Sequence, residues 1–215
     1  MLFDLDGTLA DTAPDLAWAL NTLRQEQGLP PLPFAAIRPV VSHGANALLQ
    51  TGFGLTPEEP GHTALRQRYL ALYRDNICRK TRLFPGMAAL LDFIEGHGKN
   101  WGVVTNKPAF LTQPLLAALG LTARAACIIS GDSLPQRKPH PAPLLAGCAQ
   151  AGSTPCQCLY VGDARRDIQA GRAAGMATAV ALFGYLDPAD APADWGADVL
   201  ADSAAALKSY LAGGQ

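Results

Sequence analysis

Short apolar segments alternate with helical patterns from Pro85 onward, and this alternation limits the possible folds more than any other feature. The predicted strands are Leu2–Leu5 near the start, then Trp101–Thr105, Cys127–Ser130, Cys158–Val161 and Ala177–Leu182, and the predicted helices are Met87–Ile94, one opened by Pro108, Pro143–Ala151 and Asp167–Ala174. Buried parallel strands are expected to be apolar, and right-handed crossovers place helices on both faces of their sheet. The alternation therefore predicts an α/β protein with a doubly wound parallel sheet.

A helical stretch separates the first strand from this region. Asp11 and Thr12 are candidate N-caps, Pro14 suits a first turn, and helical spacing continues past the proline-rich residues 30–33 as far as Tyr73. We expect residues 1–12 and 84–215 to form the core, residues 13–83 to form a small helical domain, and residues 197–212 to add a last strand and helix.

The composition excludes several classes of function. The 215 residues are 49% hydrophobic and 16% charged, and 17 basic against 18 acidic side chains leave a net charge of −1. Such a chain buries a core, and without a Lys/Arg-rich run it lacks the basic surface typical of nucleic-acid binding. The longest apolar stretch, Ile168–Leu186, contains Gln169 and Arg172, so it is not a membrane span. We expect neither a nucleic-acid nor a membrane partner.

The cysteines and the N-terminal residues bear on location. Five cysteines are an odd number, and they lack the paired C-x-x-C spacing of a zinc site, so reduced thiols are expected. The first residues fit neither a signal peptide nor a membrane anchor. Together these features predict a cytoplasmic protein, and they leave its oligomeric state open.

Polar residues follow the predicted strands at the edge of the sheet where doubly wound folds bind their ligands. They are Asp4-Leu5-Asp6-Gly7-Thr8, Thr105-Asn106-Lys107, Lys138-Pro139, and Gly162-Asp163 with Asp167 one helical turn later. Converging carboxylates repel one another and are costly to bury unless a divalent cation that prefers oxygen ligands lies among them. The pattern predicts a Mg²⁺ site.

Asp4 and Asp6 lie two residues apart where the strand ends, so their side chains can take different roles. A carboxylate that attacks phosphorus forms an aspartyl-phosphate and divides a difficult hydrolysis into two easier steps. We assign Asp4 as the nucleophile. We assign Asp6 as the general acid that protonates the leaving alkoxide and then as the general base that activates water.

A phosphoryl group also needs donors that are fixed before reaction. We expect Thr105, Asn106 and the Lys138 ammonium to supply them, and we expect Gly7 to let its backbone N–H approach the phosphate. Each motif has a simpler explanation in isolation, such as a turn, a helix cap, a solvated lysine or, for Asp167, an acid at a helix N-terminus. Their occurrence together favours a single site.

These four motifs, in this order, resemble motifs one to four of the haloacid dehalogenase superfamily. The resemblance extends over the whole chain, because the helical insert between the first two motifs is similar to a type-one cap domain on a Rossmannoid core. It implies that Asp4 is the nucleophile, that Asp6 is the acid and base, and that Mg²⁺ is held by the Asp4 carboxylate, the Asp6 carbonyl oxygen and Asp163. It also implies that Asp167 is a second carboxylate near the metal or its waters.

Two branches of the superfamily are similar to particular segments. Val104–Pro108, Lys138–Pro141 and Asp167–Ala170 resemble phosphoglycolate phosphatases, whereas Trp101–Val104 and the segment from Gly184-Tyr185 to Asp194–Asp198 resemble N-acetylmuramic acid 6-phosphate phosphatases. The resemblance implies Mg²⁺-dependent hydrolysis of a small phosphorylated metabolite through an aspartyl-phosphate.

The alternatives are a phosphosugar mutase of the same superfamily and a catalytically silent module that binds phosphorylated metabolites. Thr8 disfavours the mutase, in which valine is typical at that position. A silent module would be expected to lack Asp4 or Asp163, and this chain has both.

Recognition of the leaving group is expected in the cap. Arg38, Ser42, His43 and Asn46 lie around Gly44, where a break between two helices can direct a loop into the active site. We expect Arg38 and His43 to contact the substrate. The simpler explanation is that both are exposed loop residues.

Overall fold

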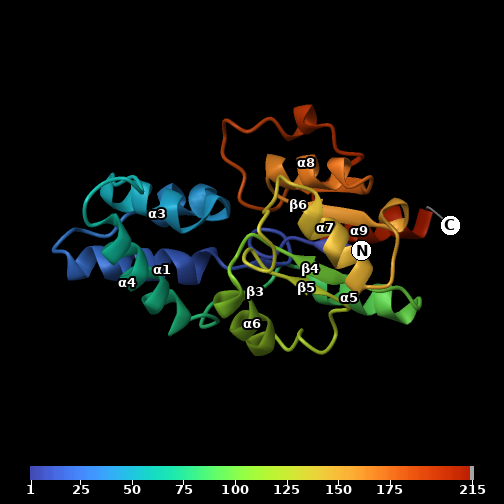
Figure 1. The fold of residues 1–215 in the computed structure, drawn as a ribbon, viewed down its shortest axis with the longest axis horizontal. Helices are drawn as coiled ribbons and strands as arrows, with labels where there is room; N and C mark the ends of the chain where they lie inside the picture. The colour runs from blue at the N-terminus through green and yellow to red at the C-terminus, as the bar shows by residue number, and fades with distance from the viewer. Residues whose placement is uncertain (214–215) are drawn as a thin grey trace.

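A computed structural model of the chain describes residues 1–213, and within them a six-stranded parallel sheet forms the centre (Figure 1). Its strands are β1 (Leu2–Phe3), β4 (Gly102–Val104), β5 (Ile128–Ile129), β6 (Leu159–Gly162), β7 (Ala177–Ala181) and β8 (Val199–Ala201), in the order β5-β4-β1-β6-β7-β8. From β1 the chain builds outward to β4 and β5, and then returns to β6 on the other side. The predicted doubly wound α/β fold is confirmed, and its switch point lies at β1.

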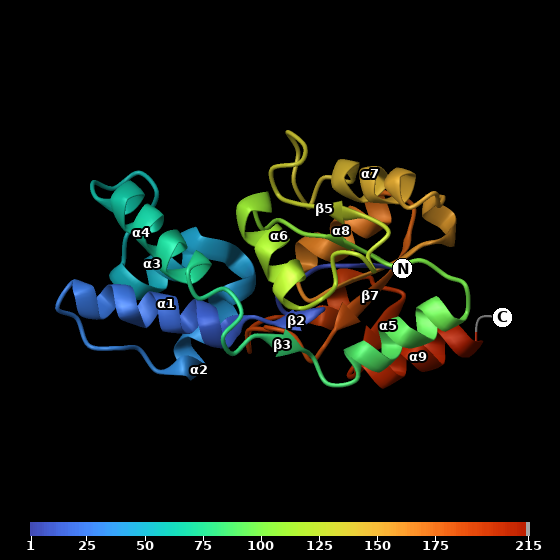
Figure 2. The same ribbon diagram turned by 90° about the horizontal axis from the view of Figure 1, so that it is seen from below.

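Helices cover both faces of the sheet, as Figure 2 shows. They are α5 (Met87–Gly96), α6 (Ala109–Ala118), α7 (Ala142–Gln150), α8 (Arg165–Ala173) and α9 (Ala204–Gly213). Neighbouring strand residues point to opposite faces, so Phe3 packs in the same cluster as α5, α6 and α9, whereas Leu2 packs in the cluster of α7 and α8. Each face of the sheet is therefore buried under its own apolar layer.

The first strand is shorter than the predicted Leu2–Leu5. The backbone N–H of Asp4 still donates to the Val161 carbonyl at 2.8 Å, but the N–H of Leu5 turns back to the Asp4 carboxylate at 2.8 Å. This local hydrogen bond competes with the strand ladder and ends β1 at Phe3. The chain therefore leaves the sheet at the two residues expected to carry chemistry.

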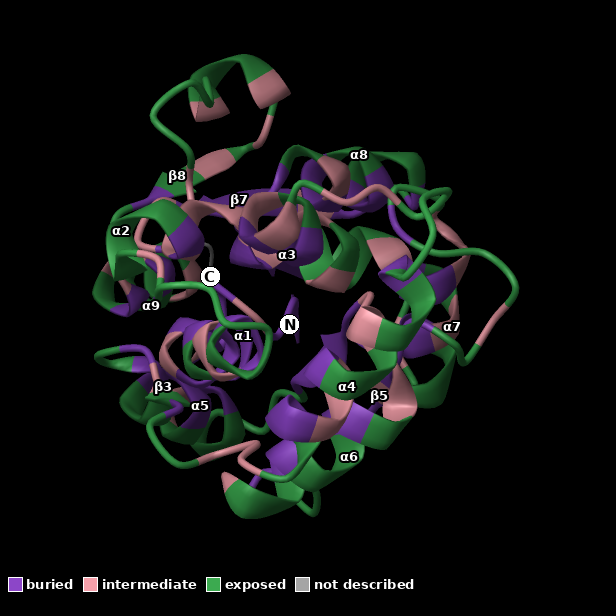
Figure 3. Cartoon of the chain, turned by 90° about the vertical axis from the view of Figure 1, so that its left-hand side faces the viewer, coloured by how far each residue is buried: buried purple, intermediate pink, exposed green. Residues whose placement is uncertain are grey.

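Between the first two strands of the main sheet, an insert of helices lies to one side, at the left of Figure 1. Its elements are α1 (Ala13–Glu26), α2 (Phe34–Ile37), the 3₁₀ helix η1 (Arg38–His43), α3 (Gly44–Phe53) and α4 (His62–Arg74). The sides of α1, α3 and α4 that face one another are buried, and their outer sides are exposed (Figure 3). The insert thus has its own apolar interior. The exact division at residues 12 and 84 stays a prediction.

The insert begins and ends on a two-stranded antiparallel ribbon. It is formed by β2 (Ala10–Asp11) and β3 (Arg82–Leu83), with Ala10 opposite Leu83. The buried Asp15 carboxylate, in the first turn of α1, accepts hydrogen bonds from the backbone N–H groups of Lys80 and Thr81 at 2.8–3.0 Å. The two connections between insert and core are therefore held side by side.

The start of α1 differs from the prediction that Asp11 or Thr12 caps it. Neither side chain bonds to the first turn, and the Thr12 hydroxyl instead donates to Asp6 Oδ1 at 2.6 Å. The free N–H of Ala13 donates to the hydroxyl of Tyr185, which itself donates to Asp11 Oδ1 at 2.7 Å. A core residue, distant in sequence, replaces the local cap.

The remaining elements complete the expected pattern. The predicted last strand and helix are present as β8 and α9, and short 3₁₀ turns occur at η2 (Pro155–Gln157) and η3 (Pro192–Trp195). Among residues 1–213, no helix combines the length and the apolar character that crossing a membrane requires.

Candidate active site

Asp4 lies at the switch point of the sheet, directly after β1. The residue is 3% exposed and lines a cavity of about 360 Å³ between the core and the helical insert. Lys138 Nζ lies 2.9 Å from its Oδ1. The ends of β1, β4 and β6 meet here because parallel strands present their carboxyl ends at one edge.

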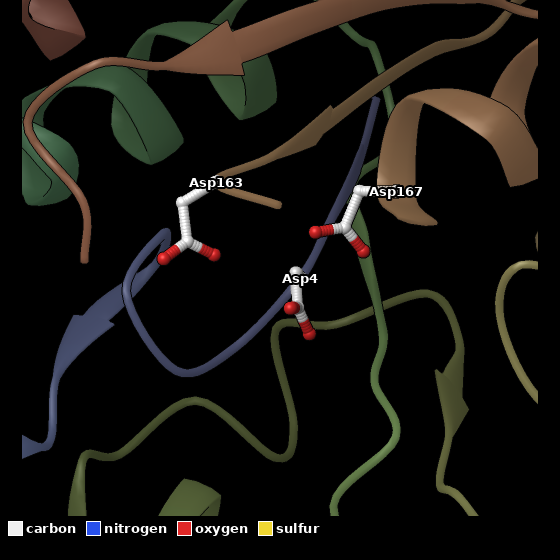
Figure 4. A group of neighbouring side chains, drawn as sticks. All are labelled: Asp4, Asp163 and Asp167. Carbon is white, nitrogen blue, oxygen red and sulfur yellow. The ribbon is translucent and has the colours of Figure 1, made fainter. Parts of the chain in front are cut away.

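Three carboxylates gather at this edge, as Figure 4 shows. Asp4 follows β1, Asp163 follows β6 and Asp167 lies in the first turn of α8, and each offers an oxygen within 4.8 Å of the others. All three are buried. The structure therefore brings together Asp4, Asp163 and Asp167, the three carboxylates in the set expected to bind metal.

The electrostatics of the cluster follow from burial and mutual repulsion. Burial, reinforced by the charges of Asp4 and Asp167, raises the pKa of Asp163 to about 7. Burial also raises the pKa of Asp167 above its usual range, although Lys138 opposes the change. Burial acts on Asp4 in the same direction, but Lys138 and Arg166 outweigh it and hold the Asp4 pKa below its usual value. Asp4 is therefore the carboxylate best kept ionised.

The residues of the cluster fit a divalent cation. Carboxylate oxygens are the ligands that Mg²⁺ prefers, and buried charges of one sign need a counter-ion. Within residues 1–213 the one ammonium or guanidinium at ion-pair distance from these three carboxylates is that of Lys138, whose Nζ lies 2.9 Å from Asp4 Oδ1 and 2.8 Å from Asp167 Oδ1. One ammonium does not balance three buried carboxylates, so the cluster is suited to hold a cation.

Glycines let the carboxylates approach the backbone. Gly7 has φ +79°, and a Cβ placed there would overlap the Asp163 carboxylate. Gly162 and Gly184 likewise lie where a Cβ would collide with Asp167 and Asp163, respectively. The expected role of Gly7 as a phosphate donor needs correction, because its N–H donates to the Ala10 carbonyl at 3.1 Å. Gly7 is required here for its backbone conformation and for space.

Lys138 and Asn106 form one unit. The Asn106 side chain donates to the Lys138 carbonyl at 3.0 Å and accepts the Lys138 N–H at 3.1 Å, so it holds the lysine backbone from both sides. Thr105 Oγ1 accepts the N–H of Lys107 at 3.2 Å. Thr105 and Asn106 line the cavity beside Asp4, as expected, but the amide of Asn106 is already engaged in positioning Lys138.

Asp6 points away from the acidic cluster. Its Oδ1 accepts the Thr12 hydroxyl at 2.6 Å and the Lys107 ammonium at 2.9 Å, and Lys107 also lies 3.2 Å from Oδ2. The carboxylate lines the cavity beside Asp4. A carboxylate that lines the cavity beside Asp4 and is oriented by a hydroxyl and an ammonium is placed for proton transfer at a leaving group.

The two expected substrate contacts in the cap have different positions. His43 lines the cavity at the end of η1. Arg38 is not among the residues lining the cavity: it donates to the Gly184 carbonyl at 3.0 Å, and its guanidinium lies 4.7 Å from the centre of the Tyr185 ring. Arg38 therefore fastens η1 to the core, and the expectation that it contacts substrate is not supported.

Three residues to which the sequence assigned no role complete the site. Lys107 pairs with Asp6, Arg166 Nη2 donates to the Ser42 carbonyl at 2.6 Å, and the Ser42 hydroxyl donates to Asp163 Oδ2 at 2.7 Å. Lys107 stands in the motif Thr105-Asn106-Lys107, and Arg166 directly precedes the motif residue Asp167, so the motifs themselves indicate both positions. Ser42 joins the site only through the packing of the insert on the core.

The geometry can be compared with that of known proteins. Residues 1–181 match the family of haloacid dehalogenase-like hydrolases. A crystal structure of a predicted phosphoglycolate phosphatase from Haemophilus somnus 129PT superposes with a TM-score of 0.86 at 31% identity, over 98% of this chain and 96% of that one. Fold and sequence therefore point to the same group of proteins.

Two phosphatases are similar in sequence to this chain over nearly their whole length. The N-acetylmuramic acid 6-phosphate phosphatase of Pseudomonas aeruginosa is 43% identical over 202 residues, which are 94% of this chain and 89% of that protein. The phosphoglycolate phosphatase of Xanthomonas campestris pv. campestris (strain 8004) is 45% identical over 202 residues, 94% of this chain and 91% of that protein. Both are phosphatases, and their names give different substrates.

Proposed function

The chain belongs to the haloacid dehalogenase-like hydrolase family and is a phosphatase, and from that premise we propose that it hydrolyses a small phosphorylated metabolite with the aid of Mg²⁺. The observation that carries the proposal is the position of the ionised Asp4 beside the buried Lys138, in a cavity that the helical insert also lines. Phosphoglycolate and N-acetylmuramic acid 6-phosphate are the leading substrates, because each is named for a relative of similar identity.

In the first step, an Asp4 carboxylate oxygen attacks phosphorus and the bond from phosphorus to the leaving oxygen breaks. The leaving alkoxide takes a proton from the carboxyl group of Asp6, which lines the cavity beside Asp4. The products of this step are the aspartyl-phosphate and the free alcohol. Lys138 supplies positive charge beside the attacking carboxylate and stays fixed through the Asn106 contacts.

In the second step, Asp6 takes a proton from water while the water oxygen attacks phosphorus. The bond between phosphorus and Asp4 breaks, which releases inorganic phosphate, frees the Asp4 carboxylate and leaves Asp6 protonated again for the next turnover. The Asp4 and Asp163 carboxylates and the Asp6 carbonyl would hold Mg²⁺, with Asp167 beside them. When bound, the metal neutralises charge between Asp4 and the phosphoryl oxygens.

The test is phosphate release from a panel of esters with Mg²⁺, and with EDTA in its place. The panel contains phosphoglycolate, N-acetylmuramic acid 6-phosphate, glucose phosphates and nucleotides. We expect Mg²⁺-dependent release and a preference for one of the first two. Asp4→Asn should abolish release while the melting curve stays cooperative, and Asp6→Asn should abolish it while a phosphate analogue still binds.

Two results would contradict the proposal. Transfer of the phosphoryl group back to a sugar would indicate the mutase considered from the sequence, and binding without turnover would indicate the silent module. Substantial turnover by Asp4→Asn would remove Asp4 from the nucleophile role. The cytoplasmic location and the absence of nucleic-acid and membrane partners stay predictions from the sequence.

A further inference from the structure

One face of α4 forms part of the cavity wall opposite Asp4. Arg66, Tyr69, Leu70 and Tyr73 all line the cavity, and their spacing of three and four residues places them on one side of the helix. Tyr69 and Tyr73 are fully buried, and Arg66 is half-buried. The insert therefore presents one guanidinium at the edge of an aromatic and apolar wall.

Arg66 differs from the other arginines of its helix. Arg68 pairs with Glu26, and Arg74 lies 2.9 Å from Asp75. No hydrogen bond or ion pair joins the Arg66 side chain to any residue in 1–213. Arg68 and Arg74 therefore each have an acidic partner, whereas Arg66 has none within residues 1–213.

The side chains that line the cavity carry an excess of positive charge. Its lining contains two carboxylates, Asp4 and Asp6, against four cationic side chains, which are Arg66, Lys107, Arg137 and Arg166. Asp6 is neutralised by Lys107, and Asp4 lies 2.9 Å from Lys138 below the cavity floor. Arg137 is exposed and screened by water. Burial lowers the pKa of the half-buried Arg166, but the charges of Asp167, Asp4 and Asp163 outweigh this effect and raise it, so the acidic cluster balances Arg166. Arg66 is the remaining half-buried cation of the lining, and it has no ion pair within residues 1–213.

A second polar group on this face also has no partner. The Tyr73 hydroxyl is buried and has no hydrogen bond to residues 1–213. Buried hydroxyl groups are normally satisfied, and a half-buried guanidinium normally has an anion. The Arg66 guanidinium and the Tyr73 hydroxyl, seven residues apart on one helix face, both lack a partner. We infer that a ligand supplies it.

We propose that Arg66 selects for a carboxylate on the leaving group of the substrate. This inference rests on the proposed function. The phosphoryl group lies at Asp4, so the leaving alcohol extends towards α4, and the planar guanidinium can hold a carboxylate through two parallel hydrogen bonds. Arg66 makes no contact with the reacting atoms and is a specificity-determining residue.

The experiment compares esters that differ in the carboxylate. N-acetylmuramic acid 6-phosphate is paired with N-acetylglucosamine 6-phosphate, which lacks the lactyl carboxylate, and phosphoglycolate is paired with 2-hydroxyethyl phosphate. Both pairs are assayed with the wild type, Arg66→Gln and Arg66→Lys, and with Arg74→Gln as the matched control from the same helix. p-Nitrophenyl phosphate measures turnover of an ester that carries no such group.

We expect the wild type to prefer the carboxylated member of one pair. Arg66→Gln should lower kcat/KM for that ester by roughly 10- to 100-fold, mainly through KM, and change the neutral ester by less than about twofold. Arg66→Lys should recover part of the loss, because the charge remains without the planar fork. Arg74→Gln should resemble the wild type on all esters.

Three results would overturn the inference. The first is a wild type that hydrolyses the esters but ignores the carboxylate, which leaves the proposed function intact. The second is an equal loss on both members of a pair in Arg66→Gln, which indicates a structural role. The third is a wild type that hydrolyses no ester, p-nitrophenyl phosphate included, which removes the proposed function as well.

Discussion

Lys107 forms a bidentate ion pair with Asp6, its ammonium 2.9 Å from Oδ1 and 3.2 Å from Oδ2. The same ammonium lies 4.5 Å from the centre of the Tyr73 ring, which belongs to α4 of the insert. A cation in contact with an aromatic face and a carboxylate is held from two sides. The orientation of the assigned acid and base therefore depends on how the insert packs against the core.

Replacement of Lys107 tests this dependence. Lys107→Met removes the charge that orients Asp6, and we expect kcat to fall by about 10-fold or more, a fraction of the contribution of general acid–base catalysis. Lys107→Arg should retain more activity, because a cation can still reach Asp6. Lys99→Met, at an exposed lysine, is the control. An unchanged kcat in Lys107→Met would show that Asp6 needs no positioning by this residue.

Asn106 offers a test of how Lys138 is held. Asn106→Ala removes both hydrogen bonds to the Lys138 backbone, and we expect kcat to fall by roughly 10-fold, with a loss of stability of about 1–3 kcal/mol. Steady-state kinetics and urea denaturation measure the two effects. Asn100→Ala, which removes one exposed hydrogen bond to the Ala151 carbonyl, should change neither appreciably. A variant as active as the wild type would mean that Lys138 is positioned without its neighbour.

The stability of the metal-free protein should fall as the pH rises. Asp163 has a pKa of about 7 in the folded chain against an ordinary value of 3.8, so folding favours its neutral form. Its contribution to stability is complete below about pH 4 and is lost as the pH rises through 7. The lowered pKa of Asp4 acts only at acidic pH. In EDTA, we expect a melting temperature lower by on the order of 5 °C at pH 8 than at pH 5.

Asp163→Asn is the control for this effect. Because asparagine carries no charge, the variant should lose much of the pH dependence, and the remainder reports on Asp167. Added Mg²⁺ should raise the melting temperature of the wild type at pH 8 and leave the variant nearly unchanged, because binding to the folded state alone stabilises it. Equal pH dependence in both proteins would exclude Asp163 as its source.

The structural role of Gly7 can be distinguished from that of an ordinary turn glycine by comparing two alanine variants. Gly7→Ala imposes a positive φ on alanine and places its Cβ on the Asp163 carboxylate, whereas Gly28→Ala has a φ of +72° with open space around it. Gly28→Ala should cost about 1 kcal/mol of unfolding free energy. Gly7→Ala should cost more than that and should also abolish Mg²⁺-dependent turnover. Similar losses in the two variants would mean that the backbone conformation accounts for the whole effect.

Much of the site could be predicted from the sequence because parallel strands bring their carboxyl ends together. Asp4 and Asp163 follow strands that are neighbours in the sheet, so finding the strands was enough to place both at one edge. The motif order also indicated the family, which the match over residues 1–181 confirms. The position of Lys138 could be predicted in the same way, because its loop follows β5 at that edge.

Contacts that depend on the packing of the insert could not be predicted. Thr12 has the sequence position of an N-cap, but Asp6 lies close enough to take its hydroxyl. Arg38 was expected at the substrate and instead stacks on Tyr185, a residue of the core distant in sequence. Ser42 reaches Asp163 for the same reason. Local patterns describe such residues only as loop positions.

The ribbon of β2 and β3 has a consequence for how this protein can change over time. Because the insert enters at Ala10–Asp11 and leaves at Arg82–Leu83, on paired strands, its removal or replacement leaves the two ends of the core already adjacent. The residues proposed to attack phosphorus and to hold the cation, Asp4, Asp6, Asp163 and Asp167, all lie outside the insert. A different set of helices can therefore be grafted at this junction, and substrate range can evolve as an exchangeable module while the reaction stays the same.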